Sequence, residues 1–181
     1  MYIAKQLKEK NVAEYLLYMW QVEDLIRANH LEIEELKNNY INKFKASPEQ
    51  EKEMTEWYAN LIDMMRSEQV QQTGHLQINK NMIILLTDLH VQLLNSPKFP
   101  FYSAAYYKAL PYIVEIRARN NNREMPELES CFEVLYGVML LKMQKKPVSA
   151  DTLKAVDDIS KLLGMLSDYY IQEKKGLLKF E

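Results

Sequence analysis

Four polar residues in one short segment could carry chemistry: Glu23, Asp24, Arg27 and His30. At helical spacing, Glu23 and His30 fall on the same stripe as four apolar residues, Val12, Leu16, Met19 and Ile26. A carboxylate on an apolar stripe is costly to bury unless a cation or hydrogen-bond donors pair with it. The segment 12–30 therefore predicts a buried polar site within a helical core.

Two interpretations of this polar site are open. In the first, Glu23 pairs with Arg27 one helical turn later, a partner from another helix completes the network, and the network fixes how helices dock. In the second, a ligand pocket opens in the bundle, where Arg27 binds an anion and Glu23 serves as an acceptor or a base. We favour the first interpretation, because buried ion-pair networks also occur where no reaction takes place.

The three histidines do not form a metal motif. A di-iron helical bundle needs Glu three residues before a His, and those positions hold Arg27, Gln72 and Thr87. His30 shares a helix face with Glu34 only if the helix continues past residue 29, and His90 is expected in the core with one hydrogen bond. Sequence motifs for nucleophilic catalysis and for phosphate or dinucleotide binding are absent. We therefore predict no catalytic residue, metal or cofactor, and leave open whether the protein is an enzyme.

A second candidate site is the aromatic cluster between residues 99 and 112. Its proposed interaction face consists of Phe99, Phe101, Tyr102, Tyr106 and Tyr107. Tyr102 and Tyr106 share one helix face with Ala109, which indicates packing beneath a corner that contains prolines. The alternative is a partly exposed platform for a protein partner or a planar ligand, because tyrosine is enriched at interfaces. We favour packing and keep the interaction face as the alternative.

The elements that position these residues are predicted to be helices almost throughout. Apolar periodicity and capping signals indicate helices at residues 3–9, 12–29, 31–44, 48–73, 76–95, 102–119 and 126–144, and from residues 149–151 onward. Asn11 with Glu14, and Ser47 with Gln50, have the spacing of capping boxes. Pro111 should kink or end its helix, and a loop is expected at 120–124.

We expect the 181 residues to form a single all-α domain, an antiparallel up-and-down bundle of six or seven helices. The chain has only four glycines, which favours long helices joined by short loops over turn-rich β architectures. With 48% apolar residues, it can bury a core without disulfides or a structural metal. The segment 95–100, which contains two prolines, is the candidate for a weak division between two halves.

Charge and cysteine content restrict the partners and the location. A formal net charge of −2 gives no general attraction to nucleic acid or anionic membranes, and Lys98 and Lys108 alone are thin support for base stacking. The longest apolar run, residues 82–86, is far too short to span a membrane. Cys131 is the single cysteine, and the first residues lack the apolar run of a signal peptide. We predict a cytoplasmic protein with no nucleic-acid or membrane partner.

Three stretches point to a known family: YIAKQLKEKNVAEYLLYMWQVEDLIRA at 2–28, SPEQ at 47–50 and SPKFPFYSAAYYKALPYI at 96–113. With the length of about 180 residues, they resemble a domain-of-unknown-function (DUF) family from Bacteroidetes-type bacteria. The most specific stretch is EYLLYMWQVEDLIR at 14–27. The resemblance implies an uncharacterised cytoplasmic protein and supplies no activity, ligand or catalytic residue.

We predict a non-enzymatic helical module that binds a protein, either another copy of itself or a different partner. The lack of catalytic motifs and the aromatic and methionine-rich faces support this function. The alternative is a small-molecule-binding protein or enzyme with a pocket in the bundle near Glu23 and Arg27. That alternative requires an open cavity into which both charged side chains point.

Overall fold

The computed structural model describes residues 2–119 and 125–180, and every regular element within them is a helix. The order is α1 (Tyr2–Lys10), α2 (Val12–Ala28), α3 (Ile33–Asn39), a 3-10 turn η1 (Ile41–Lys43), α4 (Pro48–Ser67), α5 (Gln77–Asn95), α6 (Pro100–Arg119), α7 (Glu127–Met143) and α8 (Ala150–Lys174). The all-α prediction is confirmed, with eight α-helices in these residues where six or seven were expected. The loop predicted at 120–124 lies outside the described residues. None of the helices described is both long and apolar enough to cross a membrane.

Side-chain caps start two helices where the sequence predicts them. Asn11 Oδ1 accepts the backbone N–H groups of Ala13 and Glu14 at 3.1 and 3.2 Å. Ser47 Oγ accepts the N–H of Gln50 at 3.2 Å, and the Gln50 side chain accepts the N–H of Ser47 at 3.0 Å. These bonds satisfy N–H groups that the first turn of a helix leaves unpaired. Both helix starts are therefore fixed by local sequence.

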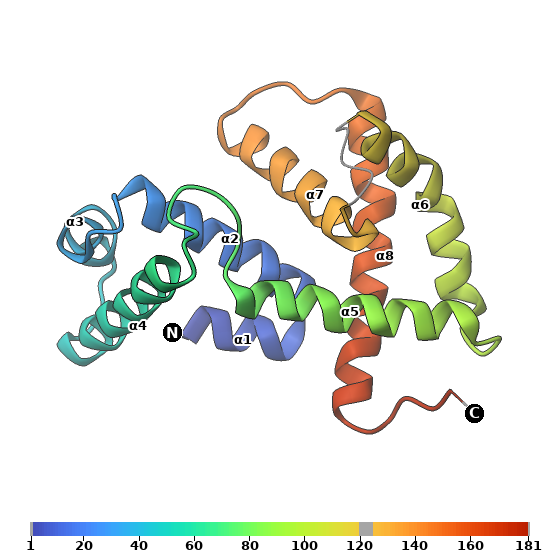
Figure 1. The fold of residues 1–181 in the computed structure, drawn as a ribbon, viewed down its shortest axis with the longest axis horizontal. Coiled ribbons are helices and arrows are strands. Elements are labelled where there is room, and N and C mark those ends of the chain that lie inside the picture. Colours follow the sequence, from blue (N-terminus) through green and yellow to red (C-terminus); the bar gives the residue numbers. More distant parts are fainter. Residues whose placement is uncertain (1, 120–124, 181) are drawn as a thin grey trace.

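The long helix α8 is the central element of the fold. It contacts α2, α5, α6 and α7, and α5 runs across it in Figure 1. Figure 1 also shows α3 and α4 together at one end of the molecule and α6 at the opposite end. The N-terminal helices therefore reach the C-terminal ones mainly through α2 and α5, which both touch α8.

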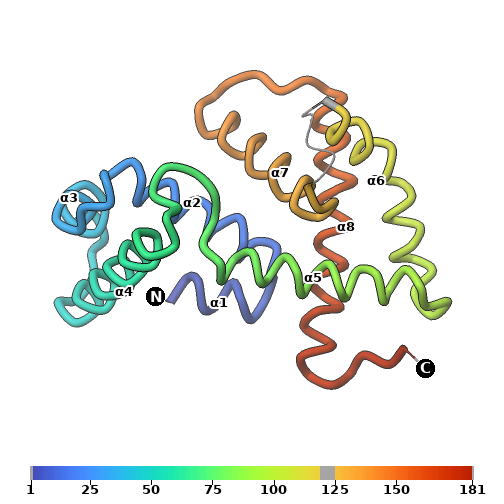
Figure 2. Tube along the Cα trace, in the orientation of Figure 1, coloured from blue at the N-terminus to red at the C-terminus, as the bar shows by residue number. Residues whose placement is uncertain are grey.

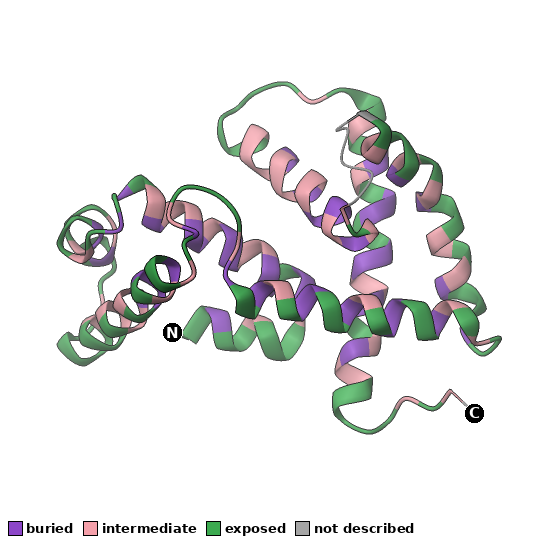
Figure 3. Cartoon of the chain, in the orientation of Figure 1, coloured by how far each residue is buried: buried purple, intermediate pink, exposed green. Residues whose placement is uncertain are grey.

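The buried core draws side chains from all eight helices (Figure 3). Its largest fully buried side chains include Trp20 on α2, Tyr58 on α4, Tyr102 on α6 and Phe132 on α7. Burial of aromatic groups of this size is a major source of stability in a domain of this length. Residues on both sides of the segment 95–100 belong to this one cluster.

The helix α6 continues through Pro111 and bends in its second half (Figure 2). A proline inside a helix lacks the N–H for one backbone bond and its ring crowds the carbonyl four residues earlier, so a bend is expected there. One face of α6 packs into the core through Tyr102, Ala109 and Ile113. Because α6 curves around α8, the opposite face is turned outward.

Candidate functional site

Glu23 is fully buried, and its hydrogen-bond donors come from the start of α5 rather than from its own helix. Oε1 accepts the N–H of Leu76 at 3.0 Å and the side-chain amide of Asn79 at 2.7 Å, while Oε2 lies 2.6 Å from Nδ1 of His75. Leu76 caps α5 and has no side-chain oxygen of its own for this role. Glu23 does not replace an N-cap side chain: it accepts the N–H of the cap residue Leu76 and the Asn79 side chain, and it places negative charge at the positive end of the α5 dipole.

His75 is held in one orientation by two neighbours. Its ring stacks on the Trp20 indole, with 3.9 Å between ring centroids and 9° between the planes. Glu23 accepts two other N–H groups through Oε1, and its Oε2 accepts from Nδ1 of His75 in the tautomer that carries the ring proton on Nδ1. Within the described residues, Nε2 of His75 has no hydrogen-bond partner. One ring nitrogen is thus left for a group outside the core.

An open cleft of about 350 Å³ lies beside His75. Its walls come from α2, the loop before α5, and α7, and its lining residues are Trp20, Asp24, His75, Glu133, Val134, Tyr136 and Gly137. Asp24 Oδ2 accepts the hydroxyl of Tyr136 at 2.7 Å, and burial followed by this bond raises the pKa of Tyr136. Burial, and then the charge of Glu129, raise the pKa of Glu133. The cleft therefore holds two carboxylates that are only partly solvated.

Arg27 does not pair with Glu23, so the expected intrahelical ion pair is wrong. Its Nη1 donates to Asp24 Oδ1 at 2.8 Å, and its Nη2 donates to two backbone carbonyls, those of Val70 (3.1 Å) and Gly74. Gly74 has a φ of +86°, a conformation that glycine adopts without strain. Arg27 consequently holds the loop between α4 and α5 against α2.

The predicted pocket, with both Glu23 and Arg27 pointing into it, is also not what the structure contains. The Glu23 carboxylate is sealed by its three donors, and Arg27 is occupied by Asp24 and backbone carbonyls. The open cleft is lined instead by Asp24, which the sequence predicted as a site residue, and by His75. The sequence patterns did not single out His75.

His30 lies outside the polar site. The helix α2 ends at Ala28, and φ angles of +55° at His30 and +58° at Leu31 turn the chain away. Nδ1 of His30 is 2.8 Å from Oε2 of Glu35 at the surface, and this hydrogen bond raises the pKa of His30. The apolar stripe that carries Glu23 therefore stops before His30, and that part of the prediction is wrong.

His90 and Cys131 are core residues, as the sequence predicts. His90 makes one hydrogen bond, between Nδ1 and the hydroxyl of Tyr102 at 2.5 Å, and burial lowers its pKa to about 4. Burial also raises the pKa of the Cys131 thiol to about 12. In the described part of the chain, no three residues among His, Cys, Asp and Glu are grouped so that they could hold a metal ion.

The predicted aromatic face divides between the core and the surface. Phe99 and Tyr102 are 8% and 0% exposed, and Tyr106 is half-buried. Phe101 and Tyr107 are 80% and 66% exposed. The packing interpretation therefore applies to one part of the cluster, and two of the five rings are left for a partner.

The outward rings belong to a longer apolar stripe on α6. Its exposed apolar members, spaced three or four residues apart, are Phe101, Ala104, Tyr107, Pro111, Val114 and Ala118. Figure 3 shows exposed residues along the outer side of this helix. Two charged residues, Lys108 and Glu115, accompany them, and Lys108 donates to the buried Asp158 on α8 at 2.6 Å. We call the six apolar residues the α6 stripe.

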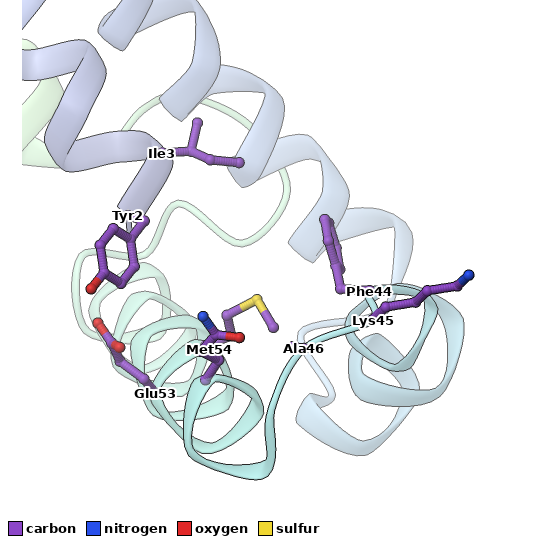
Figure 4. A pocket seen from close by; sticks show the side chains of 8 residues that line it. Tyr2, Ile3, Phe44, Lys45, Ala46, Glu53 and Met54 are labelled. Carbon is purple, nitrogen blue, oxygen red and sulfur yellow. The ribbon is translucent and has the colours of Figure 1, made fainter.

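A smaller apolar pocket of about 290 Å³ lies where α1 approaches α4. Figure 4 shows Tyr2, Ile3, Phe44 and Met54 around it, while the Lys45 side chain points away. No sequence pattern indicated it, because its residues come from three separate segments. The pocket would accept an apolar group, but it contains no group with evident chemistry.

One family model matches almost the entire chain. It is described as a domain of unknown function (DUF4924), and the match covers residues 1–177. No curated protein and no solved structure matches the chain. The match confirms the resemblance to a DUF family of about this length and leaves the biochemical role to be argued from the site.

Proposed function

The chain belongs to the DUF4924 family, and we propose that it is a non-enzymatic helical module that binds a second copy of itself through the α6 stripe. The observation that carries this proposal is the exposure of Phe101, Tyr107 and Val114 on one face of α6. The opposite face of the same helix is already buried in the core. A helix that is apolar on both faces is typical of a buried element, so a partner that covers the outer face is favoured.

The α6 stripe is complementary to itself in an antiparallel arrangement. With Pro111 at the two-fold axis, Ala104 of one copy lies opposite Ala118 of the other. The same register places Tyr107 opposite Val114 on one flank of the contact. Small residues along the midline let two helices approach closely, and a two-fold contact repeats each pair.

Charge supports the antiparallel direction. In the same register, Lys108 of one copy lies opposite Glu115 of the other, twice per dimer. A parallel pair in register would instead leave Lys108 and Glu115 of the two copies about 10 Å apart along the helix axis, so they would not pair. The Lys108 side chain remains 62% exposed beside Asp158 and so can reach a second carboxylate.

The contact is expected to be weak and reversible. The bend at Pro111 makes the outer face of α6 convex, so two copies touch mainly near the middle of the helix. One face of a single helix is small beside a standard interface of about 800 Å² per partner. We therefore expect a dissociation constant on the order of 10–100 µM.

Replacing Tyr107 and Val114 together with serine should abolish self-association. Both side chains are mostly exposed in the single chain, so the fold should be unaffected, while the central apolar contacts of the dimer are lost. Sedimentation equilibrium over a concentration series should give a dissociation constant at least about tenfold weaker than that of the wild type.

A matched control exists on α5. Ile84 and Val91 are also seven residues apart and are 55% and 49% exposed, so their double serine variant removes a comparable apolar surface elsewhere. This control should dimerise like the wild type. A wild-type chain that stays monomeric throughout the series, or a control that weakens association as much, contradicts the proposal.

Four further expectations from the sequence belong to the same proposal. They are a single domain, a cytoplasmic location, an origin in Bacteroidetes-type bacteria and an up-and-down order of helices. The shared core supports the single domain, and the free buried Cys131 suits a reducing compartment. Contacts between the consecutive pairs α1–α2, α3–α4 and α6–α7 support short connections between neighbours.

A further inference from the structure

We propose that the cleft beside His75 binds a small ligand that carries a protonated amine. The cleft is formed by α2, α7 and the loop before α5, and it does not involve the α6 stripe. A ligand site here is therefore independent of self-association, and either can fail without the other. Its volume of about 350 Å³ is at the lower end for small-molecule pockets, which suits a compact ligand.

Three groups in the cleft accept hydrogen bonds. In the neutral ring with its proton on Nδ1, which faces Glu23 Oε2 at 2.6 Å, Nε2 of His75 has its lone pair available. Glu133 has no ion-pair or hydrogen-bond partner in the part of the chain that is described. Asp24 Oδ2 accepts only the hydroxyl of Tyr136 and can accept a second bond. A primary ammonium group offers three N–H donors, which matches these three acceptors.

The charge balance around the cleft favours a cation. Glu23, Asp24 and Glu133 bring three carboxylates within or beneath it. Arg27 pairs with Asp24, and the one basic group among the described residues that line the cleft is the His75 ring, which faces Glu23 and acts on Glu133. Glu129 adds a further negative charge next to Glu133. The burial of Glu23 and the partial burial of Glu133 lower the effective dielectric, so a bound cation gains more here than at an open surface.

The other walls of the cleft suit a short apolar tail. The ring of Tyr136 and the side chain of Val134 line the cleft from α7, and Gly137 leaves space between them and α2. A site with convergent polar groups and apolar walls is typical of small-ligand recognition. Butylammonium is therefore a suitable probe, with butanoate as a probe of similar size and opposite charge.

The test follows the Cε1–H signal of His75 by NMR at about pH 8, where a primary amine such as butylamine is protonated. Adding butylammonium chloride to the wild type should move this signal along a saturable curve, whereas sodium butanoate should leave it in place. The signals of the other two histidines, His30 and His90, serve as internal references. No saturable shift of the His75 signal, or an equal response to butanoate, overturns the proposal.

Two variants decide whether the response arises in this cleft. Glu133→Gln removes the partner-free carboxylate and should weaken butylammonium binding about tenfold. Glu56→Gln makes the same charge change on the exposed side of α4 and should bind like the wild type. Equal weakening by both variants would show only a general charge effect and would contradict the assigned site.

Discussion

Replacing Glu23 with alanine is expected to lower the free energy of unfolding by about 3–5 kcal/mol. The variant leaves the Leu76 N–H, the Asn79 amide and Nδ1 of His75 buried or half-buried without their acceptor. Each unsatisfied group costs about 1–3 kcal/mol, and the positive end of the α5 dipole also loses the negative charge beside it. Urea unfolding followed by circular dichroism measures the difference from the wild type.

Two further variants test whether the loss of stability comes from the contacts of Glu23 rather than from removing any carboxylate. Glu23→Gln keeps one oxygen for Leu76 and Asn79 and should lose about 1–2 kcal/mol, which keeps the test readable even if the alanine variant unfolds. Glu56→Ala removes an exposed carboxylate from α4 and should change stability by less than about 0.5 kcal/mol. If Glu23→Ala is no more costly than Glu56→Ala, Glu23 does not tie α2 to α5.

Lowering the pH from 7 to 4 should remove about 3 kcal/mol of stability through His90 alone. Burial lowers the pKa of this histidine to about 4, from an ordinary value near 6.5. Between these two values the unfolded chain takes up a proton that the folded chain does not bind. The contribution of His90 is therefore complete above about pH 6.5 and is lost as the pH falls towards 4.

The measurement compares how stability depends on pH in two histidine variants. His90→Gln should flatten the decline between pH 6.5 and 4, even though losing the bond to Tyr102 lowers stability at neutral pH. His30→Gln changes a surface histidine and should keep the steep decline. A wild-type curve no steeper than that of His90→Gln would contradict the burial of a neutral His90.

Local signals in the sequence predicted where the helices begin, whereas the helix expected at 48–73 ends at Ser67 and the one expected at 31–44 ends at Asn39. The caps at Asn11 and Ser47 depend on residues only two or three positions away, so a linear pattern contains all of the necessary information. Pro111 likewise bends α6 through contacts within a single helical turn. The end of α2 was predicted within one residue, but the placement of His30 on its stripe was wrong, because the left-handed turn at His30 and Leu31 contains no glycine that would indicate it.

The partners of Glu23 could not be predicted in the same way. They lie 52 to 56 residues further along the chain, and only the packing of α5 on α2 brings them close. The sequence did indicate that a buried Glu23 needs donors. The available signal was His75, which lies two residues before the start of α5. Arg27 is nearer in the sequence and could also have donated hydrogen bonds to Glu23.

For the aromatic cluster, unlike for Glu23, the spacing along the helix does separate the buried side chains from the exposed ones. Tyr102 and Ala109 are buried on one face of α6, as their shared face predicts. Phe101 and Tyr107 fall on the other face at the same periodicity, so a count of helical positions could have separated them. Sequence alone does not show which face meets the core, because both are apolar.

Disulfide trapping tests self-association through α6 most directly. Two variants, Tyr107→Cys and Val114→Cys, are mixed under mild oxidation, because the antiparallel register places these positions opposite each other. Within either variant alone, the matching cysteines would lie about 9–12 Å apart along the helix axis, beyond the Cα separation that a disulfide bridges. The native Cys131 is buried with a raised pKa and should not react.

The proposal predicts a covalent dimer that forms in the mixture and much less in either variant alone. This result would establish the contact, its direction and its register together. A mixture that yields no more covalent dimer than the separate variants would contradict the pairing of α6 with α6, and with it the proposed function of the protein.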